Sequence, residues 1–97
     1  MRKGGHLYIM TNAARRPVYI GVTSNLVFRV DRHRRGMGSA YCRRYNLTKL
    51  VYIEEYPTIV EAIAREKAMK AWKRAWKDEL INKANPQWYD LWDVINA

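Results

Sequence analysis

The sequence predicts one α/β (α+β) domain, a small three-stranded sheet flanked by helices, and three observations support this. The chain has 97 residues, about the size of a single domain and too short for a second core. Its composition is globular, with 48% hydrophobic and 28% charged residues. Short runs of β-branched and aromatic residues alternate with stretches of helical periodicity. We therefore expect residues 1–97 to form a single domain.

The first two strands are predicted over residues 7–10 and 18–22, joined by a loop with turn residues at both ends. This pattern is typical of an antiparallel β-hairpin. If Met10 pairs with Pro17, Tyr8 lies directly opposite Tyr19, and partners in an antiparallel pair point to the same face. The two tyrosines are therefore expected to stand side by side.

The first helix is expected to begin after Thr23 or Ser24 as the N-cap and to end near Arg35, before Gly36. Its spacing of i, i+3, i+4 and i+7 places a guanidinium and an imidazole on the apolar face, which consists of Leu26, Arg29, Val30 and His33. Polar groups on that face make it a candidate site.

The third strand is predicted over the apolar run of residues 50–53, either covered on both faces or central in the sheet. Thr58 and Glu61 then form a capping-box pattern that starts the longest helical stretch, to about Asn82. Whether this stretch is one helix or two with a break near Lys73 is left open. Its inward stripe contains a single carboxylate and consists of Ile59, Ala62, Ile63, Glu66 and Met69. The aromatic tail at residues 85–92 is expected to pack back onto the body.

The charge of the chain predicts a polyanionic partner. The net charge is +9 and the isoelectric point is near 10.0. Residues 1–49 carry eleven basic side chains and one acid, Asp31, whereas residues 50–97 are nearly neutral. The lone Cys42 excludes an intramolecular disulfide, and the first apolar run is too short for a signal sequence or a membrane span. We expect a cytoplasmic protein that binds nucleic acid and no membrane.

Three groups of residues together carry a resemblance to a known family. Leu7-Tyr8-Ile9 is followed by Tyr19-Ile20-Gly21 and then by Arg29, and a helical glutamate, Glu66, comes later. This order resembles the GIY-YIG nuclease superfamily, particularly its small standalone single-domain members, whose helix and closing motifs recur at residues 62–67 and 85–88. One departure is that His6 and Leu7 precede Tyr8 where the family's name has Gly-Ile.

The resemblance implies a three-stranded antiparallel sheet and a metal-dependent endonuclease that hydrolyses DNA phosphodiester bonds. Glu66 is the expected ligand of one divalent cation, Mg²⁺ or Mn²⁺, because such hard ions keep most of their waters and need few carboxylates. Arg29 can clamp the scissile phosphate, since its charge never titrates away. No small-molecule cofactor is expected. The candidate catalytic residues are Tyr8, Tyr19, Arg29, His33, Glu66 and Asn85, with Asn82 as a substitute for Asn85.

The general base is the open part of this site. Tyrosine has a reference pKa near 10 and needs help from its neighbours to act at neutral pH. The resemblance implies that Tyr19 lies beside the attacking water, whereas His33, with a reference pKa near 6.5, is an alternative base or proton shuttle. We expect Tyr19 to be the base with His33 assisting, and Tyr8 to orient water or phosphate by a hydrogen bond.

Substrate binding is predicted over a basic, aromatic loop that suits phosphates with stacked, unpaired bases. Single-stranded DNA or flaps are therefore the expected substrates, without sequence specificity. The residues of this surface are Arg32, Arg34, Arg35, Tyr41, Arg43, Arg44, Tyr45 and Lys49. Trp72 and Trp76 are a weaker second candidate, because helical tryptophans at this spacing are more often core.

A non-catalytic nucleic-acid-binding module with the same basic surface is the rival hypothesis. Tyr8 and Tyr19 would then be a cross-strand pair, and Glu66 would only pair with Lys70 or Lys73 along its helix. The two hypotheses differ over Glu66, because a carboxylate near phosphate weakens binding but is needed for metal catalysis. The sequence leaves the oligomeric state open.

Overall fold

The computed structural model describes residues 4–97; Arg2 and Lys3, two of the eleven basic residues in the first half, lie outside the described residues. The elements follow in the order β1 (Gly5–Thr11), β2 (Tyr19–Thr23), α1 (Leu26–Arg34), α2 (Ala40–Tyr45), β3 (Lys49–Tyr56), α3 (Ile59–Lys70), α4 (Arg74–Ala84) and α5 (Trp92–Ile95). Within this range, no helix is long and apolar enough to cross a membrane.

The three strands form one antiparallel sheet in the order β2-β1-β3, which confirms the predicted fold class. β1 is the central strand. Two alternatives were predicted for the third strand, and the first one holds. β3 lies at an edge of the sheet but is covered on both faces, because Leu50 and Val51 are both fully buried and belong to different cores.

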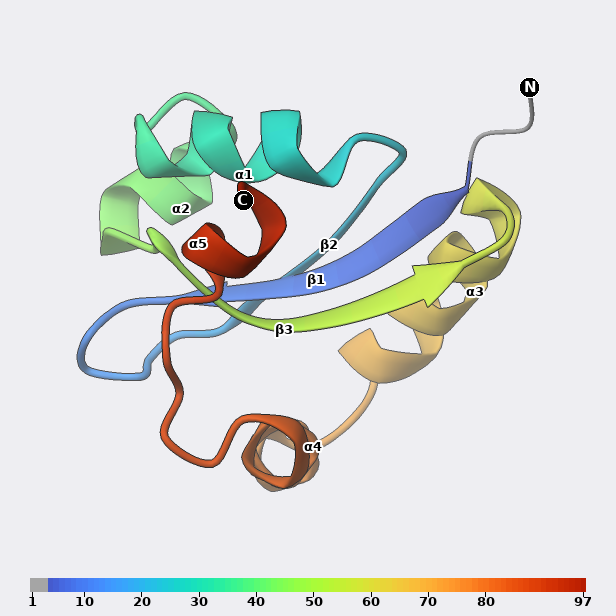
Figure 1. Cartoon of the computed structure of the whole chain (residues 1–97). Helices are drawn as coiled ribbons and strands as arrows, with labels where there is room; N and C mark the ends of the chain where they lie inside the picture. Colours follow the sequence, from blue (N-terminus) through green and yellow to red (C-terminus); the bar gives the residue numbers. More distant parts are fainter. Residues whose placement is uncertain (1–3) are drawn as a thin grey trace.

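Helices cover both faces of the sheet (Figure 1). Side chains of β1 alternate between the two layers, as the period of a strand requires. Leu7 and Ile9 belong to a core with Met69 of α3 and Ile81 of α4. The second core, on the side of α1 and α2, consists of Tyr8, Met10, Leu26, Val30, Cys42, Leu47 and Leu50. The sheet thus brings Tyr8 beneath α1.

The predicted register of the hairpin is wrong by two residues. Met10 pairs with Tyr19 rather than with Pro17, and Tyr8 therefore lies opposite Gly21. The loop is longer than expected because Asn12 organises it: its side-chain amide donates to the carbonyl oxygens of Arg16 and of Tyr45 in α2. A shift by two keeps every side chain on its face, so Tyr8 and Tyr19 remain diagonal neighbours with ring centroids 6.4 Å apart.

Two helix starts differ from the sequence prediction. Asn25, not Thr23 or Ser24, caps α1 by accepting a hydrogen bond from the Phe28 amide. Residues 40–45, predicted as part of a loop, form α2, which begins after the cap residue Ser39 and ends at Asn46 in the left-handed conformation.

The long helical stretch is divided into two helices. The capping box of Thr58 and Glu61 is present at the start of α3, as predicted. The chain leaves helical geometry after Lys70, and α4 begins after Lys73. The aromatic tail packs back onto the body as predicted, with Trp88 almost fully buried in the core next to Ile81.

Candidate active site

A hydrogen-bonded trio of Tyr8, Arg29 and His33 lies between the sheet and α1. The Tyr8 hydroxyl is 2.8 Å from Nε2 of His33, and Nε of Arg29 donates to the same hydroxyl over 3.3 Å. Arg29 and His33 reach Tyr8 together because they are one helical turn apart on α1. Tyr8 is fully buried, so its hydroxyl fixes these two side chains rather than meeting solvent.

Two glycines make room for this trio. A Cβ atom on Gly21 would lie 2.5 Å from both Cζ and the hydroxyl oxygen of Tyr8. A Cβ atom on Gly38 would lie 2.6 Å from Nδ1 of His33. Both separations are far below contact distance, so any larger residue displaces one end of the Tyr8–His33 hydrogen bond. Gly21, the last residue of the Tyr-Ile-Gly motif, therefore leaves the space that the Tyr8 ring occupies.

Burial fixes the protonation states of the trio. It raises the pKa of Tyr8 far above its usual range, and the nearby Arg29 does not offset this effect. Burial, with a further contribution from Arg29, lowers the pKa of His33 to about 4. Hydrogen bonding to Tyr8 raises the pKa of Arg29 despite desolvation, and Tyr19 contributes in the same direction. At neutral pH the trio therefore consists of a neutral phenol, a neutral imidazole and one permanent cation.

Tyr19 connects the trio to the surface. Its ring lies 5.4 Å from the His33 ring and 6.2 Å from that of Tyr41, centroid to centroid. Tyr41 in turn lies 5.0 Å from Tyr45, which produces a row of three tyrosine rings from the sheet to exposed positions on α2. Tyr19 and Tyr41 also line an open hollow of about 260 Å³. Tyr19 is the half-buried member of this row.

Glu66 lies on α3, which packs against β1 and β2 from the other side of the sheet. Its carboxylate is 17% exposed and lies 3.5 Å from the ammonium group of Lys70. Lys70 also lines the hollow of Tyr19 and Tyr41. Glu66 therefore borders the hollow through Lys70 and does not belong to the hydrogen-bonded trio. In the part of the chain that the structure describes, no cluster of three or more histidine, cysteine or acidic residues could hold a metal.

Asn85 caps the end of α4 and holds the tail to the sheet. Its amide donates to the carbonyl oxygens of Val51 and Tyr89, 3.0 Å away in each case, and its oxygen accepts from the Tyr89 amide. Asn82 contacts the indole of Trp88. All these partners are main-chain groups or core aromatics, so the contacts of both asparagines are structural.

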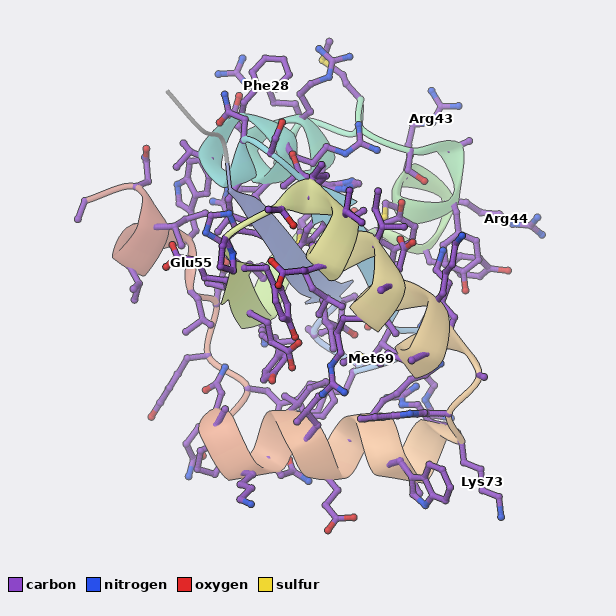
Figure 2. The ribbon with its side chains drawn as sticks, turned by 90° about the vertical axis from the view of Figure 1, so that its right-hand side faces the viewer. Phe28, Arg43, Arg44, Glu55, Met69 and Lys73 are labelled. Carbon is purple, nitrogen blue, oxygen red and sulfur yellow. The ribbon has the colours of Figure 1, made fainter. Side chains whose placement is uncertain are left out.

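The basic residues predicted to bind nucleic acid differ in their contacts. Two arginines at the end of α1 form ion pairs: Arg34 with Asp90 at 2.8 Å, and Arg35 with Asp31 at 2.9 Å. Two others lie on α2, where the Arg44 guanidinium stacks 5.4 Å from the Tyr45 ring and Arg43 is exposed. Figure 2 shows Arg43 and Arg44 projecting from one side of the molecule.

Other predicted members of this surface have local partners or begin a strand. Arg32 donates to the Met37 carbonyl oxygen over 3.4 Å, and Lys49 is the half-buried first residue of β3. The sequence interpretation did not assign Gly38 to the site. It placed Lys70 and Lys77 around Trp72 and Trp76 in the weaker second candidate surface, but it did not connect these lysines with Tyr19.

Comparison with known proteins agrees with this geometry. The chain is 32% identical over 83 residues to a UPF0213 protein of Bacillus pumilus, which covers 86% of this chain and 85% of the relative. A UPF0213 protein of Staphylococcus aureus is 32% identical over 78 residues, covering 80% and 95% of the two chains. One from Pediococcus pentosaceus is 29% identical over 79 residues, covering 81% and 83%. No solved structure matches the chain. The family description "GIY-YIG catalytic domain" matches residues 4–83, and the chain belongs to this family.

Proposed function

We propose that this protein is a metal-dependent endonuclease that hydrolyses DNA phosphodiester bonds, with a preference for single-stranded or branched DNA. The observation that carries the proposal is the trio of Tyr8, Arg29 and His33, which holds one permanent cation beside Tyr19, and Tyr19 lines an open hollow. A binding module needs basic groups on its surface, but it does not need a guanidinium positioned by a fully buried tyrosine.

Arg29 binds the scissile phosphate in this mechanism. Its Nε is engaged by Tyr8, which leaves the terminal nitrogens, on the side of Tyr19, to bind two phosphate oxygens. Tyr8 is the positioning residue: its high pKa keeps it protonated, so it orients Arg29 and His33 and does not itself remove a proton. The Arg29 guanidinium can then stabilise the negative charge that develops on the phosphate without first changing its own position.

Tyr19 is the better candidate for the general base. It lines the hollow where water and substrate enter, whereas His33 is only 1% exposed and its Nε2 is occupied by Tyr8. A pKa of about 4 also makes His33 a weak base at neutral pH. His33 assists by packing edge-on against the Tyr19 ring and by holding Tyr8. Direct proton abstraction by His33 would need its imidazole to leave the Tyr8 hydroxyl.

Glu66 is the residue that would hold Mg²⁺ or Mn²⁺. The fit is adequate, because the Glu66 side chain is partly exposed and its ion pair is with an exposed lysine rather than with a buried arginine. One carboxylate is enough for a hard cation that keeps most of its waters. When bound, such an ion would offset negative charge on the phosphate and on the departing oxygen.

The aromatic row supports the preference for unpaired DNA. Tyr41 and Tyr45 present partly exposed rings beside Arg43 and Arg44, and such mixtures bind phosphates while the rings stack on bases. Bases within a duplex are already stacked on each other and cannot use these rings. Arg32 and Lys49 add positive potential around this surface, and Arg34 and Arg35, which pair with acids, add less.

The substitution Glu66→Gln tests the proposal against a binding module. We expect the wild type to cleave labelled single-stranded DNA in Mg²⁺ or Mn²⁺ and not in EDTA, and Glu66→Gln to lose cleavage by at least about 100-fold. Its binding in EDTA should be unchanged or slightly tighter, since a negative charge is removed. Glu55→Gln, which removes the same charge from an exposed position of β3 that does not line the hollow of Tyr19 and Tyr41, is the matched control and should cleave normally.

Two results would reject the nuclease mechanism. One is wild-type protein that binds DNA but does not cut it with either cation. The other is Glu66→Gln that cuts as fast as the wild type. A protein that cuts only duplex DNA would retain the mechanism and refute the proposed substrate.

A further inference from the structure

Two lysines from the nearly neutral half of the chain meet Tyr19 in the open hollow. Its lining comes from four elements: Tyr19 and Ile20 at the start of β2, with Val18 just before them, Tyr41 of α2, Lys70 of α3 and Lys77 of α4. The turn between α3 and α4 brings the two ammonium groups to the same wall. The hollow has cations and phenol rings on its surface, which is the chemistry that binds a phosphate next to a base.

A second hollow lies along α4 and the α3–α4 turn. It has a volume of about 290 Å³ and is lined by Trp72, Trp76, Glu79, Leu80 and Lys83. Trp72 is held in place, because the Arg65 guanidinium lies 4.9 Å from its ring and it packs against the core. Trp76 stands edge-on to Trp72 at 6.4 Å and is 51% exposed. A rigid indole that supports an exposed one forms a stacking platform.

The surroundings of Trp76 are predominantly cationic. Lys73 lies 5.9 Å from its ring, and Lys83 lines the same hollow with one acid, Glu79. Asp78 does not reduce this potential fully, since it pairs with Arg74 at 2.6 Å. Figure 2 shows Lys73 on the same side of the molecule as Arg43 and Arg44 of α2, with Lys73 at the end nearer α4. This surface therefore complements a nucleic-acid strand, which offers both negative charge and aromatic bases, rather than a basic or purely apolar partner.

We propose that the α3–α4 turn is a second nucleic-acid subsite: Lys70 and Lys77 hold a backbone phosphate next to the scissile one, and Trp76 stacks on an adjoining unpaired base. The inference rests on the proposed function. In this arrangement the DNA strand passes over Tyr19. The nucleotides on one side of Tyr19 contact the tyrosines and arginines of α2, and those on the other side contact the α3–α4 turn. The subsite extends the substrate contact beyond the basic first half of the chain.

Binding in EDTA tests the subsite without cleavage. Fluorescence anisotropy of a labelled oligothymidylate is measured over a range of KCl concentrations. Loss of one phosphate contact reduces the slope of log K against log salt by about 0.7 for a single strand, and we expect this change for Lys77→Ala. Lys77 is preferred to Lys70 for substitution because Lys70 also pairs with Glu66. Lys67→Ala, an exposed lysine of α3 that does not line either hollow, is the matched control and should keep the wild-type slope.

The stacking step has its own test. Trp76→Ala should weaken binding of the oligothymidylate by between about 5-fold and about 150-fold, the range for removal of one base–aromatic stack, and Trp76→Phe should restore most of it. An abasic strand of the same length keeps the phosphates and lacks the bases. On that strand, Trp76→Ala should have little effect, whereas Lys77→Ala should keep its full effect.

The outcomes separate the subsite from the proposed function. If the wild type cleaves single strands in Mn²⁺ while Lys77→Ala has the wild-type salt slope, the subsite is wrong and the nuclease is retained. If Trp76→Ala binds normally, the stacking step is wrong. If the wild type binds no oligonucleotide, both proposals are wrong.

Discussion

Replacing Gly21 with alanine should disable the site through a steric effect on Tyr8. The new Cβ atom would lie 2.5 Å from Cζ and from the hydroxyl oxygen of Tyr8. Atoms in contact sit about 3.5 Å apart or more, so the end of the tyrosine must move by about 1 Å. Tyr8 is fully buried and its hydroxyl holds His33 at 2.8 Å, so the movement changes the position of the trio.

The magnitude follows from two separate costs. Overpacking of this kind destabilises a core by about 1–3 kcal/mol. A displacement of about 1 Å in a catalytic group lowers the rate by about 100-fold even in the folded protein. Urea denaturation measures the first cost, and initial rates of single-strand cleavage in Mn²⁺, at a temperature where the variant is folded, measure the second.

Gly36→Ala is the control for loss of stability alone. Gly36 has a φ of +75°, where a residue with a Cβ atom costs about 1–2 kcal/mol. The nearest atom to its new Cβ would be Cγ of Arg43 at 3.7 Å, an ordinary contact. Gly36→Ala should thus lose similar stability and keep its cleavage rate. Full cleavage by Gly21→Ala, or equal loss in both variants, would refute the steric argument.

Two further predictions concern stability and pH. The pKa of His33 is lowered to about 4, so between pH 6.5 and 4 the unfolded chain binds more protons than the folded one. The free energy of unfolding should decrease by up to about 3 kcal/mol as the pH is lowered from 6.5 to 4. The substitution His33→Gln should flatten this part of the plot of unfolding free energy against pH, measured by urea denaturation. Glu54 accepts hydrogen bonds from Tyr52 at 2.5 Å and from Arg65 at 3.0 Å; burial raises its pKa, but these bonds outweigh burial and lower it. Glu54→Gln should therefore destabilise the protein by about 2–3 kcal/mol at pH 7 without reducing single-strand cleavage, and the advantage of the wild type should vanish as the pH falls through the pKa of Glu54. A pH-independent difference, or lost cleavage, would contradict this.

The sequence predicted the elements of the sheet better than their register. Alternation over β1 places Tyr8 and Met10 on one face whatever the pairing partner, so the face was predictable. The position along the partner strand depends on the loop, and Asn12 lengthens that loop through a contact with Tyr45, which is 33 residues away in the chain. No local pattern contains that contact.

The same distinction between local and distant contacts applies to the candidate site. Arg29 and His33 are one helical turn apart, so their common face followed from spacing alone. The helix α2 has a local signal that the prediction did not use, namely Ser39 as a cap before six residues and Asn46 after them. The meeting of Lys70 and Lys77 with Tyr19 depends on the packing of α3 against β1 and β2 and of α4 against β3, which no spacing rule specifies.

The site's electrostatics are set by burial rather than by titration. Because Tyr8 stays protonated and His33 stays neutral above pH 4, Arg29 carries the trio's only charge throughout the physiological range. The affinity of this trio for a phosphate should therefore be independent of pH from about pH 5 upward. Any change of cleavage rate with pH in that range must arise outside the trio, at the group that takes the proton from water. Since Tyr19 lines the hollow and touches His33 only through its ring, a pH profile that Tyr19→Phe abolishes and His33→Gln leaves in place would assign that proton to Tyr19.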